Sequence, residues 1–361
     1  MLLVWLMVSM AAVLAVVGYI YGKYALRKVS YERWFSKTAV FVGEEVEMVE
    51  RITNRKLLPL PWIRLESMIG QGLVFGSQTN LEISRGELFQ NHISIFLLRP
   101  YRRIVRRHQV TCSRRGWYRL ESVTMTAGDP LGLSEDSRRL PQAAELVVYP
   151  RAAPLQELPL PSHSWLGEIA VRRWIGEDPF LNVGVREYRP GDSLNAVHWK
   201  ATARTGTMQV HKKDYTADPR LVICLNMEVD ENMWRNITDR ERIERGITYA
   251  AAVAEHAAAS GLVVRLICNG RLAFGEKQPI RMVQPAALRE VLETLAKLEL
   301  DMVTSMPAML EGEADEGRKD GDYLLITCHH GSRLTEAAQR LERLGNKVEW
   351  MLIPEEGGRS R

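Results

Sequence analysis

The sequence predicts a three-part fold: an N-terminal transmembrane helix, an all-β sandwich-like region and a C-terminal α/β domain of Rossmann-like type. Residues 1–22 form an apolar run without a charged side chain, which indicates a membrane helix. Residues 36–150 consist of short alternating runs broken by turn residues, which is typical of antiparallel strands. Apolar strands alternate with helices over residues 220–354, as in a parallel sheet covered on both faces. We place a connecting region at 151–219 and a flexible tail at 355–361.

The first helix is expected to be a retained membrane anchor. A helix of residues 1–22 is about 30 Å long, which matches the hydrocarbon core of a bilayer. The run lacks a basic segment before it and a small-residue cleavage site after it, which disfavours the alternative of a signal peptide. Lys23, Arg27, Lys28 and Arg33 follow the run, so the positive-inside rule predicts a single-pass protein with its N-terminus outside and its body in the cytoplasm.

The composition suits a folded chain in a reducing compartment. A hydrophobic content of 46% and a charged content of 25% are ordinary for globular domains, and a net charge of +4 is too small to indicate nucleic-acid binding. The four cysteines have no CxxC spacing, so neither a zinc site nor a disulfide framework is indicated. We expect buried, reduced thiols at Cys112, Cys224, Cys268 and Cys328, which agrees with a cytoplasmic body.

The β-rich segment predicts an antiparallel sandwich of about seven strands. It also contains a cluster of arginines, for which two interpretations stay open. One is a basic surface that meets anionic lipid headgroups or an acidic protein. The other is a solvated strand face with local ion pairs, whereas nucleic acid is disfavoured because aromatic residues are not regularly interleaved. The residues of this predicted basic surface are Arg102, Arg103, Arg106, Arg107, Arg114 and Arg115.

The α/β segment predicts four parallel strands, at "RLVICLNM", "LVVRLIC", "YLLITC" and "KVEWMLIP". The first helix is expected to begin in a capping box of Thr238 and Glu241 and to stop at Gly261. Asn269-Gly270 predicts a hairpin that adds an antiparallel edge strand. The next helix is expected to open at Pro285, and the run from Glu311 to Asp322 is predicted to be a solvated loop.

The stretch "REYRPGDSLNAVHWKATARTG" (186–206) is the densest polar stretch of the chain. It predicts a Pro-Gly turn, then a helix capped by Asp192 or Ser193 that buries Leu194, Val197, Ala201 and Trp199 and ends at Gly206. Three roles stay open: a lock that ties the β-rich region to the α/β domain, a surface for partner docking, and an active site built on His198. The residues of the binding or locking site are Arg186, Glu187, Arg189, Asp192, His198, Trp199, Lys200 and Arg204.

The chain resembles the bacterial family called domain of unknown function 58. The resemblance lies in "RRGWYRL", "GDPLGL" and above all "REYRPGDSLNAVHWKATARTGTMQV". It implies N-terminal membrane helices, a β-rich region and a von Willebrand factor A-like α/β domain. It also implies that the protein works beside a MoxR-type AAA+ ATPase and a membrane transglutaminase-like protein, in an assembly or chaperone-like role without a known reaction.

Von Willebrand A-like domains often bind Mg²⁺ after the first strand, through Asp-x-Ser-x-Ser with a Thr and an Asp from later loops. This sequence departs from the pattern, because Cys328 stands where the last Asp is expected and a neutral thiol is a poor ligand for a hard cation. We therefore predict no metal or other cofactor. The alternative is a remodelled Mg²⁺ site that binds a partner's carboxylate, with oxygen ligands from Asn226, Glu228, Asp230 and Thr304 or Ser305.

No nucleophile elbow, phosphate-binding glycine loop or paired carboxylates occur in the sequence, so we predict no enzyme and no catalytic residue. The expected function is that of a membrane-anchored cytoplasmic scaffold or adaptor. It would bind protein partners, a MoxR-type AAA+ ATPase among them, in the assembly or maturation of a membrane or envelope complex. The alternatives are the metal-dependent protein-binding module and an enzyme that uses His198.

Overall fold

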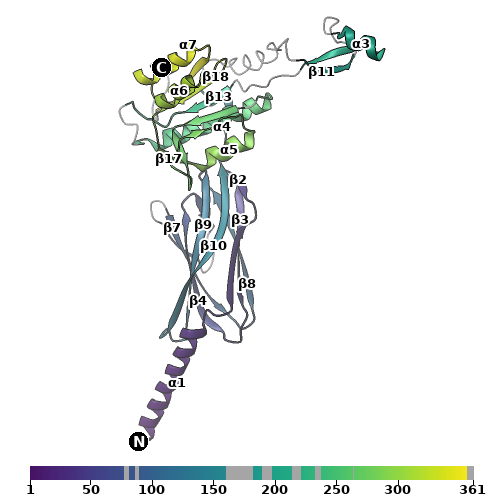
Figure 1. Ribbon diagram of the computed structural model, residues 1–361. Helices are drawn as coiled ribbons and strands as arrows, with labels where there is room; N and C mark the ends of the chain where they lie inside the picture. Colours follow the sequence, from purple (N-terminus) through teal and green to yellow (C-terminus); the bar gives the residue numbers. More distant parts are fainter. Residues whose placement is uncertain are drawn as a thin grey trace. The chain divides into compact units, whose positions relative to one another are not determined.

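The computed structural model describes residues 1–76, 81–85, 89–159, 182–188, 197–213, 221–231, 237–262 and 264–355. The chain divides into two compact units, which are described separately (Figure 1). One unit comprises Met1–Arg151 with Glu293–Leu298, and the other comprises Ala152–Leu292 with Glu299–Arg361.

The first unit begins with helix α1 (Leu2–Tyr24), which contains the predicted apolar run. This helix is long and apolar enough to cross a membrane, with a mean hydropathy of 2.4 in its most apolar window. Most of its side chains are exposed, but its carboxyl end differs: Tyr21 is buried, and so are Ala25 and Leu26 just beyond the helix. The end of α1 therefore packs as part of the domain that follows.

Two sheets pack face to face in this unit, as the sequence predicts for a sandwich. One has the strand order β1-β3-β8-β5 and the other the order β2-β10-β9-β4-β7-β6, with β2 and β10 parallel and the other pairs antiparallel. The described residues of this unit thus contain ten strands rather than about seven. The additional ones are β1, which lies before the predicted segment, and the short strands β5 and β6. The strands are β1 (Val29–Phe35), β2 (Ala39–Phe41), β3 (Glu45–Asn54), β4 (Leu60–Gly70), β5 (Leu73–Phe75), β6 (Leu81–Arg85), β7 (Phe89–Leu98), β8 (Arg103–Cys112), β9 (Gly116–Gly128) and β10 (Glu135–Tyr149).

A polar layer divides the sandwich core into two apolar clusters. One cluster contains Tyr21 and Ile52, and the other contains Phe35 and Val110. Between them, in the registers of β1, β3 and β8, lie Arg33, Glu50 and Arg106. Glu50 is buried and accepts hydrogen bonds from Tyr31 Oη at 2.6 Å and from His108 Nε2 at 3.0 Å, while His92 is buried on β7 of the opposite sheet.

The second unit contains a five-stranded sheet in the order β16-β14-β13-β18-β19. Strands β13, β14, β18 and β19 are parallel and β16 is antiparallel, which makes an open, doubly wound sheet with one antiparallel edge. The predicted α/β alternation is therefore present. The strands are β13 (Leu221–Leu225), β14 (Val264–Cys268), β16 (Ile280–Arg281), β18 (Asp322–Thr327) and β19 (Lys347–Leu352), and β15 (Gly270–Leu272) pairs with β17 (Leu298–Met302) in a separate two-stranded sheet.

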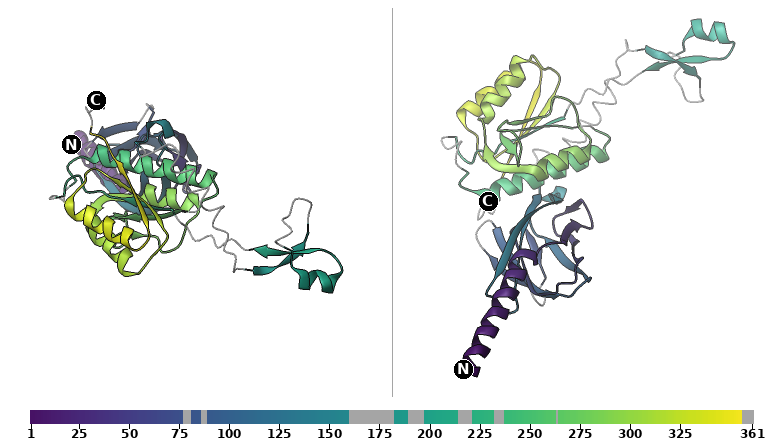
Figure 2. Two further views of the ribbon diagram at one scale, coloured as in Figure 1. Left: turned by 90° about the horizontal axis from the view of Figure 1, so that it is seen from above. Right: turned by 60° about the horizontal axis from the view of Figure 1, so that its bottom comes forward.

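Helices cover both faces of this sheet (Figures 1 and 2). Helices α6 (Met306–Asp315) and α7 (Ser332–Arg343) share an apolar cluster with Val222 and Cys224 of β13. Helix α4 (Arg240–Ala259) packs on the other face, where a Cβ on Gly246 would lie 3.4 Å from Leu225. Helix α5 (Leu288–Lys297) precedes β17, and a short 3-10 turn, η1, spans Leu155–Glu157.

Two expected helix starts in the α/β segment are wrong by one to three residues. Asp239, not Thr238, caps α4, because its carboxylate accepts from the Arg242 amide at 2.9 Å. Helix α5 begins at Leu288 rather than at Pro285, since Ala286 forms a β-bridge with Val264. The expected stop at Gly261 is confirmed, with a positive φ of 70° there.

The Asn269-Gly270 pair does not make a hairpin of β14 and β15. Strand β14 pairs instead with β16 on that side, and β15 leaves the main sheet to pair with β17. The physical reason is that the Asn269 side chain is fully buried and bound to the loop after β13, so it is not free to serve in a turn. The antiparallel edge strand exists, but it is formed by Ile280–Arg281.

The predicted solvated loop from Glu311 to Asp322 is wrong over its first half. Residues up to Asp315 belong to α6, and Glu313 on that helix is fully buried. Its charge is compensated by Arg265, whose Nη2 donates to both carboxylate oxygens at 3.1 and 3.0 Å. A charged composition therefore concealed a helix that packs on the sheet.

Candidate functional site

A cleft of about 260 Å³ opens at the carboxyl end of the parallel sheet in the second unit. The chain leaves β13 for β14 on one side and returns to β18 on the other, so the strand order reverses between β13 and β18. Such a switch point is where open α/β sheets bind ligands. We call this the switch-point cleft. It is lined by Glu228, Glu231, Val303, Thr304, Ser305, Pro307, His329, Arg333 and Leu334.

Buried amides form the floor of the switch-point cleft. Asn226 Nδ2 donates to Thr327 Oγ1 at 3.1 Å, which ties the loop after β13 to the end of β18. Asn226 Oδ1 accepts from the Glu228 amide and from Asn269 Nδ2, each at 3.0 Å. Asn269 Oδ1 in turn accepts from the Met227 amide at 2.9 Å. The three strand ends are therefore joined by a closed network of neutral hydrogen bonds.

The Glu228 carboxylate sits at the amino end of α6. It is buried, and its Oε1 accepts from the Met306 amide at 2.8 Å and from Asn269 Nδ2 at 3.3 Å. Its Oε2 lies 3.7 Å from His329 Nε2. A helix N-terminus carries a partial positive charge, which complements the carboxylate placed there.

The Glu231 carboxylate lies at the amino end of α7 in the same way. Its Oε1 accepts from the Arg333 amide and from Ser332 Oγ, each at 2.9 Å. These hydrogen bonds, first from the Arg333 backbone and then from the Ser332 side chain, hold the pKa of the Glu231 carboxyl below its usual value. One loop after β13 thus places carboxylates on two helix N-termini, and neither terminus is open to an external anion.

The residues present do not fit a Mg²⁺ ion of the expected kind. The side-chain oxygen of Asn226 and the Oε1 atom of Glu228 are already engaged by internal donors, and the Ser305 hydroxyl accepts from the Ala308 amide as the cap of α6. Asp230 is exposed, and burial raises the pKa of the Cys328 thiol to about 11, so this thiol stays protonated. Among the described residues, no group of three or more His, Cys, Asp or Glu side chains is placed to hold a metal ion.

We call the polar stretch at residues 186–206, with its flanking strands, the signature stretch. Its strand β11 (Asn182–Glu187) pairs antiparallel with β12 (Gln209–Lys213). Helix α3 (Trp199–Thr205) is shorter than expected and is capped by His198, whose Nδ1 accepts from the Ala201 amide at 3.1 Å. The predicted caps Asp192 and Ser193, with Arg189 and Leu194, lie outside the described residues. Gly206 ends the helix as expected, with a φ of 69°.

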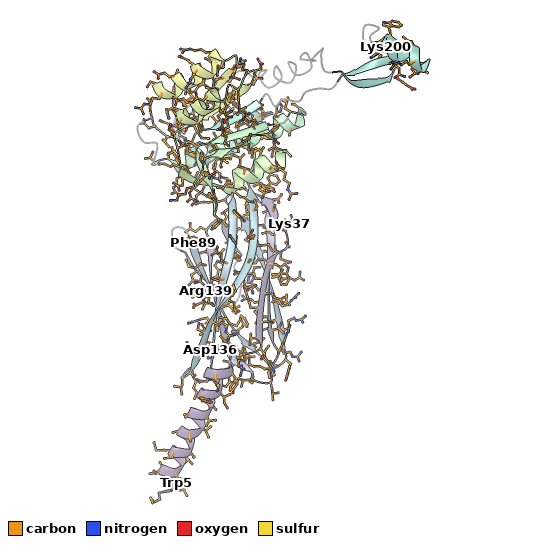
Figure 3. All side chains as sticks on the ribbon, viewed as in Figure 1. Trp5, Lys37, Phe89, Asp136, Arg139 and Lys200 are labelled. Atoms are coloured by element: carbon orange, nitrogen blue, oxygen red, sulfur yellow. The ribbon has the colours of Figure 1, made fainter. Side chains whose placement is uncertain are left out.

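The side chains of this stretch do not converge on a catalytic site in the described part of the chain. Trp199, which we expected to point inward, is 68% exposed, and no residue of helix α3 is buried. Val197 is buried as expected, but it lies before the helix and forms a β-bridge with Val210. Lys200 and Arg204 are also exposed, and Glu187 is exposed on β11 (Figure 3 labels Lys200). The Arg186 side chain lies outside what the structure describes.

The predicted basic surface is wrong as a single surface. Arg102 and Arg103 lie at the α1 end of the sandwich, whereas Arg114 and Arg115 follow β8 at its other end. Between them, Arg107 faces outward and pairs with Glu47 at 3.2 Å, and Arg106 points into the polar layer. Strand alternation separates residues that are neighbours in the sequence.

Sequence reasoning placed Asn226, Glu228 and Thr304 or Ser305 at the correct edge of the sheet but missed Glu231 and Arg333. Glu231 and Arg333 drew no attention, because each is a single charged residue in a loop or at a helix start. Asn269 had a signal, since an Asn at the end of an apolar strand also suits a switch-point loop. That signal was interpreted as a turn.

The described fold and cleft define a class: an open, doubly wound α/β domain with a polar crevice at its switch point. Residues 184–349 match the family model "Protein of unknown function DUF58", which supports the predicted family for that part of the chain. None of the curated proteins matches the sequence.

Solved structures that resemble the chain include cohesin and CARDB domains. A non-cellulosomal cohesin from Archaeoglobus fulgidus is 8% identical, with a TM-score of 0.24, over 33% of this chain and 91% of the cohesin. A CARDB domain from Pyrococcus furiosus is 16% identical, with a TM-score of 0.22, over 33% of this chain and 93% of the domain. Likenesses this low carry no argument about function.

Proposed function

We propose that this protein is a membrane-anchored adaptor, with its body in the cytoplasm, that binds a protein partner through the switch-point cleft. The partner that we expect is a MoxR-type AAA+ ATPase, with a membrane transglutaminase-like protein as a further member of the complex. The role would be the assembly or maturation of a membrane or envelope complex. Helix α1 supplies the anchor in this proposal.

The observation that carries the proposal is the way in which the polar groups of the cleft are used. The amides and the carboxylates of Glu228 and Glu231 are held by internal hydrogen bonds, so they shape the site. A general base or nucleophile needs a side chain that can exchange protons with a substrate. The rim offers the exposed Arg333 with the half-buried Thr304 and His329, a set of polar groups that suits recognition of another surface.

The signature stretch supports the same proposal through its exposed helix. Helix α3 exposes Trp199 together with Lys200 and Arg204. An exposed tryptophan flanked by basic residues is the composition of an interface hot spot. We propose this helix as a second docking element, in place of the catalytic role of His198. The lock between domains remains a prediction.

Binding of the purified host ATPase to the detergent-solubilised full chain tests the proposal. Arg333→Glu reverses a charge at the rim of the cleft and is expected to weaken binding about tenfold or more, as for a hot-spot arginine. Arg343→Glu is the matched control, because Arg343 is exposed on the same helix at its other end. Equal affinities for both variants, or no binding by the wild type, would contradict the proposed site.

A further inference from the structure

Three loops meet the carboxyl end of α1 at one end of the sandwich. The β3–β4 loop is tied to it by Lys56 Nζ, which donates to the Ala25 carbonyl at 2.6 Å, and by the Arg55 amide, which donates to the Lys28 carbonyl at 3.0 Å. The β7–β8 loop joins them through the Tyr101 amide, which donates to the Lys56 carbonyl at 3.3 Å. These contacts fix both loops around the point where the helix enters the domain.

The third loop, between β9 and β10, lies beside the helix itself. A Cβ on Gly22 would lie 2.6 Å from Ser134 Oγ, and one on Gly18 would lie 3.8 Å from Ser134 Cβ, so the glycines make room for this loop. With a rise of 1.5 Å per residue, Gly18 and Gly22 lie about 3 to 9 Å inside the end of α1 at Tyr24. The loop therefore reaches the level of the last turns of the helix.

This loop is held rigid while its leucines face solvent. The Asp129 carboxylate is buried and accepts from the backbone amides of Leu131 and Ser134, and Trp62 Nε1 donates to the Asp129 carbonyl at 2.9 Å. Leu131 and Leu133 are nevertheless 61% and 70% exposed. Holding two leucines in water next to an apolar helix is unfavourable unless another apolar phase covers them.

The charges at the same end are mostly basic. The helix end and the three loops contain one acidic residue, Asp129, which is buried, and Glu135 and Asp136 follow at the start of β10. Basic side chains near an anionic bilayer surface add attraction, and leucines beside them add insertion. The basic residues of this end are Lys23, Arg27, Lys28, Arg55, Lys56, Arg99, Arg102 and Arg103.

We propose that this end of the sandwich is a membrane-binding surface, which we call the bilayer seat. Leu131 and Leu133 insert into the bilayer beside α1, and the basic residues contact anionic phospholipid headgroups. The inference rests on the membrane anchorage in the proposed function, but it goes further. The domain would lie against the bilayer in a fixed pose and would not hang from it on a free tether.

Single-cysteine labelling of the full chain in vesicles tests the bilayer seat. The native cysteines at 112, 224, 268 and 328 are buried, so a cysteine introduced at Leu133 can be labelled selectively with an environment-sensitive dye. Phe89→Cys is the matched control, because Phe89 is a 54% exposed apolar residue at the far end of the same domain (Figure 3). The vesicles contain phosphatidylcholine with or without phosphatidylglycerol, and each includes lipids with a spin-label quencher on the acyl chain.

We expect the dye at Leu133→Cys to lose most of its fluorescence to the quencher and the dye at Phe89→Cys to lose none. Phosphatidylglycerol should deepen the quenching, and Arg102→Ser with Arg103→Ser should remove that increase. Equal quenching at both positions in chains that float with the vesicles would overturn the inference while leaving the anchor intact. Failure of the wild-type chain to float with vesicles would instead contradict the anchor. If the variant with Arg102→Ser and Arg103→Ser still shows deeper quenching with phosphatidylglycerol but no longer binds the ATPase, the basic residues bind protein rather than lipid.

Discussion

The buried carboxylate of Glu313 allows a quantitative prediction about the α/β domain. It accepts hydrogen bonds from Arg265 Nη2, from Arg281 Nε at 2.6 Å and from Tyr323 Oη at 3.2 Å. Arg265 is itself buried, on β14. Glu313→Gln removes the negative charge and leaves the Arg265 guanidinium without compensation in the interior. Breaking a buried ion pair in this way costs about 3–5 kcal/mol, a large fraction of the stability of a domain.

The thiols of the chain provide an assay that reports each unit separately. Cys224 lies in the apolar cluster beneath α6, and Cys112 lies in the core of the sandwich. Alkylation of each thiol in the full chain can be followed against urea by mass spectrometry. With a slope of about 2 kcal/mol per molar urea, Glu313→Gln should lower the midpoint for Cys224 by about 2 M. The midpoint for Cys112 should not move.

A double substitution separates the loss of compensation from the loss of packing. Replacing the pair together, as Arg265→Met with Glu313→Leu, removes both charges and is expected to recover most of the lost stability. The reasoning is refuted if Glu313→Gln leaves the Cys224 midpoint within about 0.3 M of the wild type, which is within the usual extrapolation error. It is also refuted if the double variant is as unstable as the single one.

Three further predictions concern the sandwich, the floor of the cleft and metal binding. Burial lowers the pKa of His92 to about 4, so the folded state holds this imidazole neutral. Stability should be complete above pH 6.5 and fall by about 3 kcal/mol toward pH 4, measured by alkylation of Cys112, with a flatter profile in His92→Gln. Asn269→Ala removes the acceptor of the Met227 amide and a donor to Asn226. It should lower the free energy of unfolding by about 2–4 kcal/mol in the Cys224 assay. A change below about 0.5 kcal/mol would show that the network is dispensable. Mg²⁺ in place of EDTA should leave the melting temperature unchanged, and a rise that Glu228→Ala abolishes would restore the metal-dependent alternative.

How well the sequence predicted the α/β domain depended on which elements contain charged residues. Strands such as Leu221–Leu225 are wholly apolar and were evident, because both faces of a central parallel strand are buried. Helix α6 was missed because Glu311, Glu313 and Asp315 suggested a solvated loop. The missing clue was Arg265, a lone arginine in an apolar strand, which needs a buried acid as its partner.

The candidate site was predictable in position but not in chemistry. Residues that follow parallel strands must lie at one edge of the sheet, so Asn226 and Glu228 were expected there and are found there. Whether their oxygens face a metal or one another depends on side-chain geometry that no local pattern encodes. The polar layer in the sandwich was equally hidden, because Arg33 and Glu50 occupy ordinary positions in alternating strands.

The burial of Tyr21, Ala25 and Leu26 has a practical and a mechanical consequence. These residues share one apolar cluster with Ile52, Leu98 and Met125, so the stem of the anchor is also a piece of the sandwich interior. A fragment cut just after the hydrophobic run would be left with a hole in its core and a tendency to aggregate. In the intact chain, this shared apolar cluster keeps helix α1 and the sandwich from rotating independently, so a tilt of the helix also tilts the sandwich.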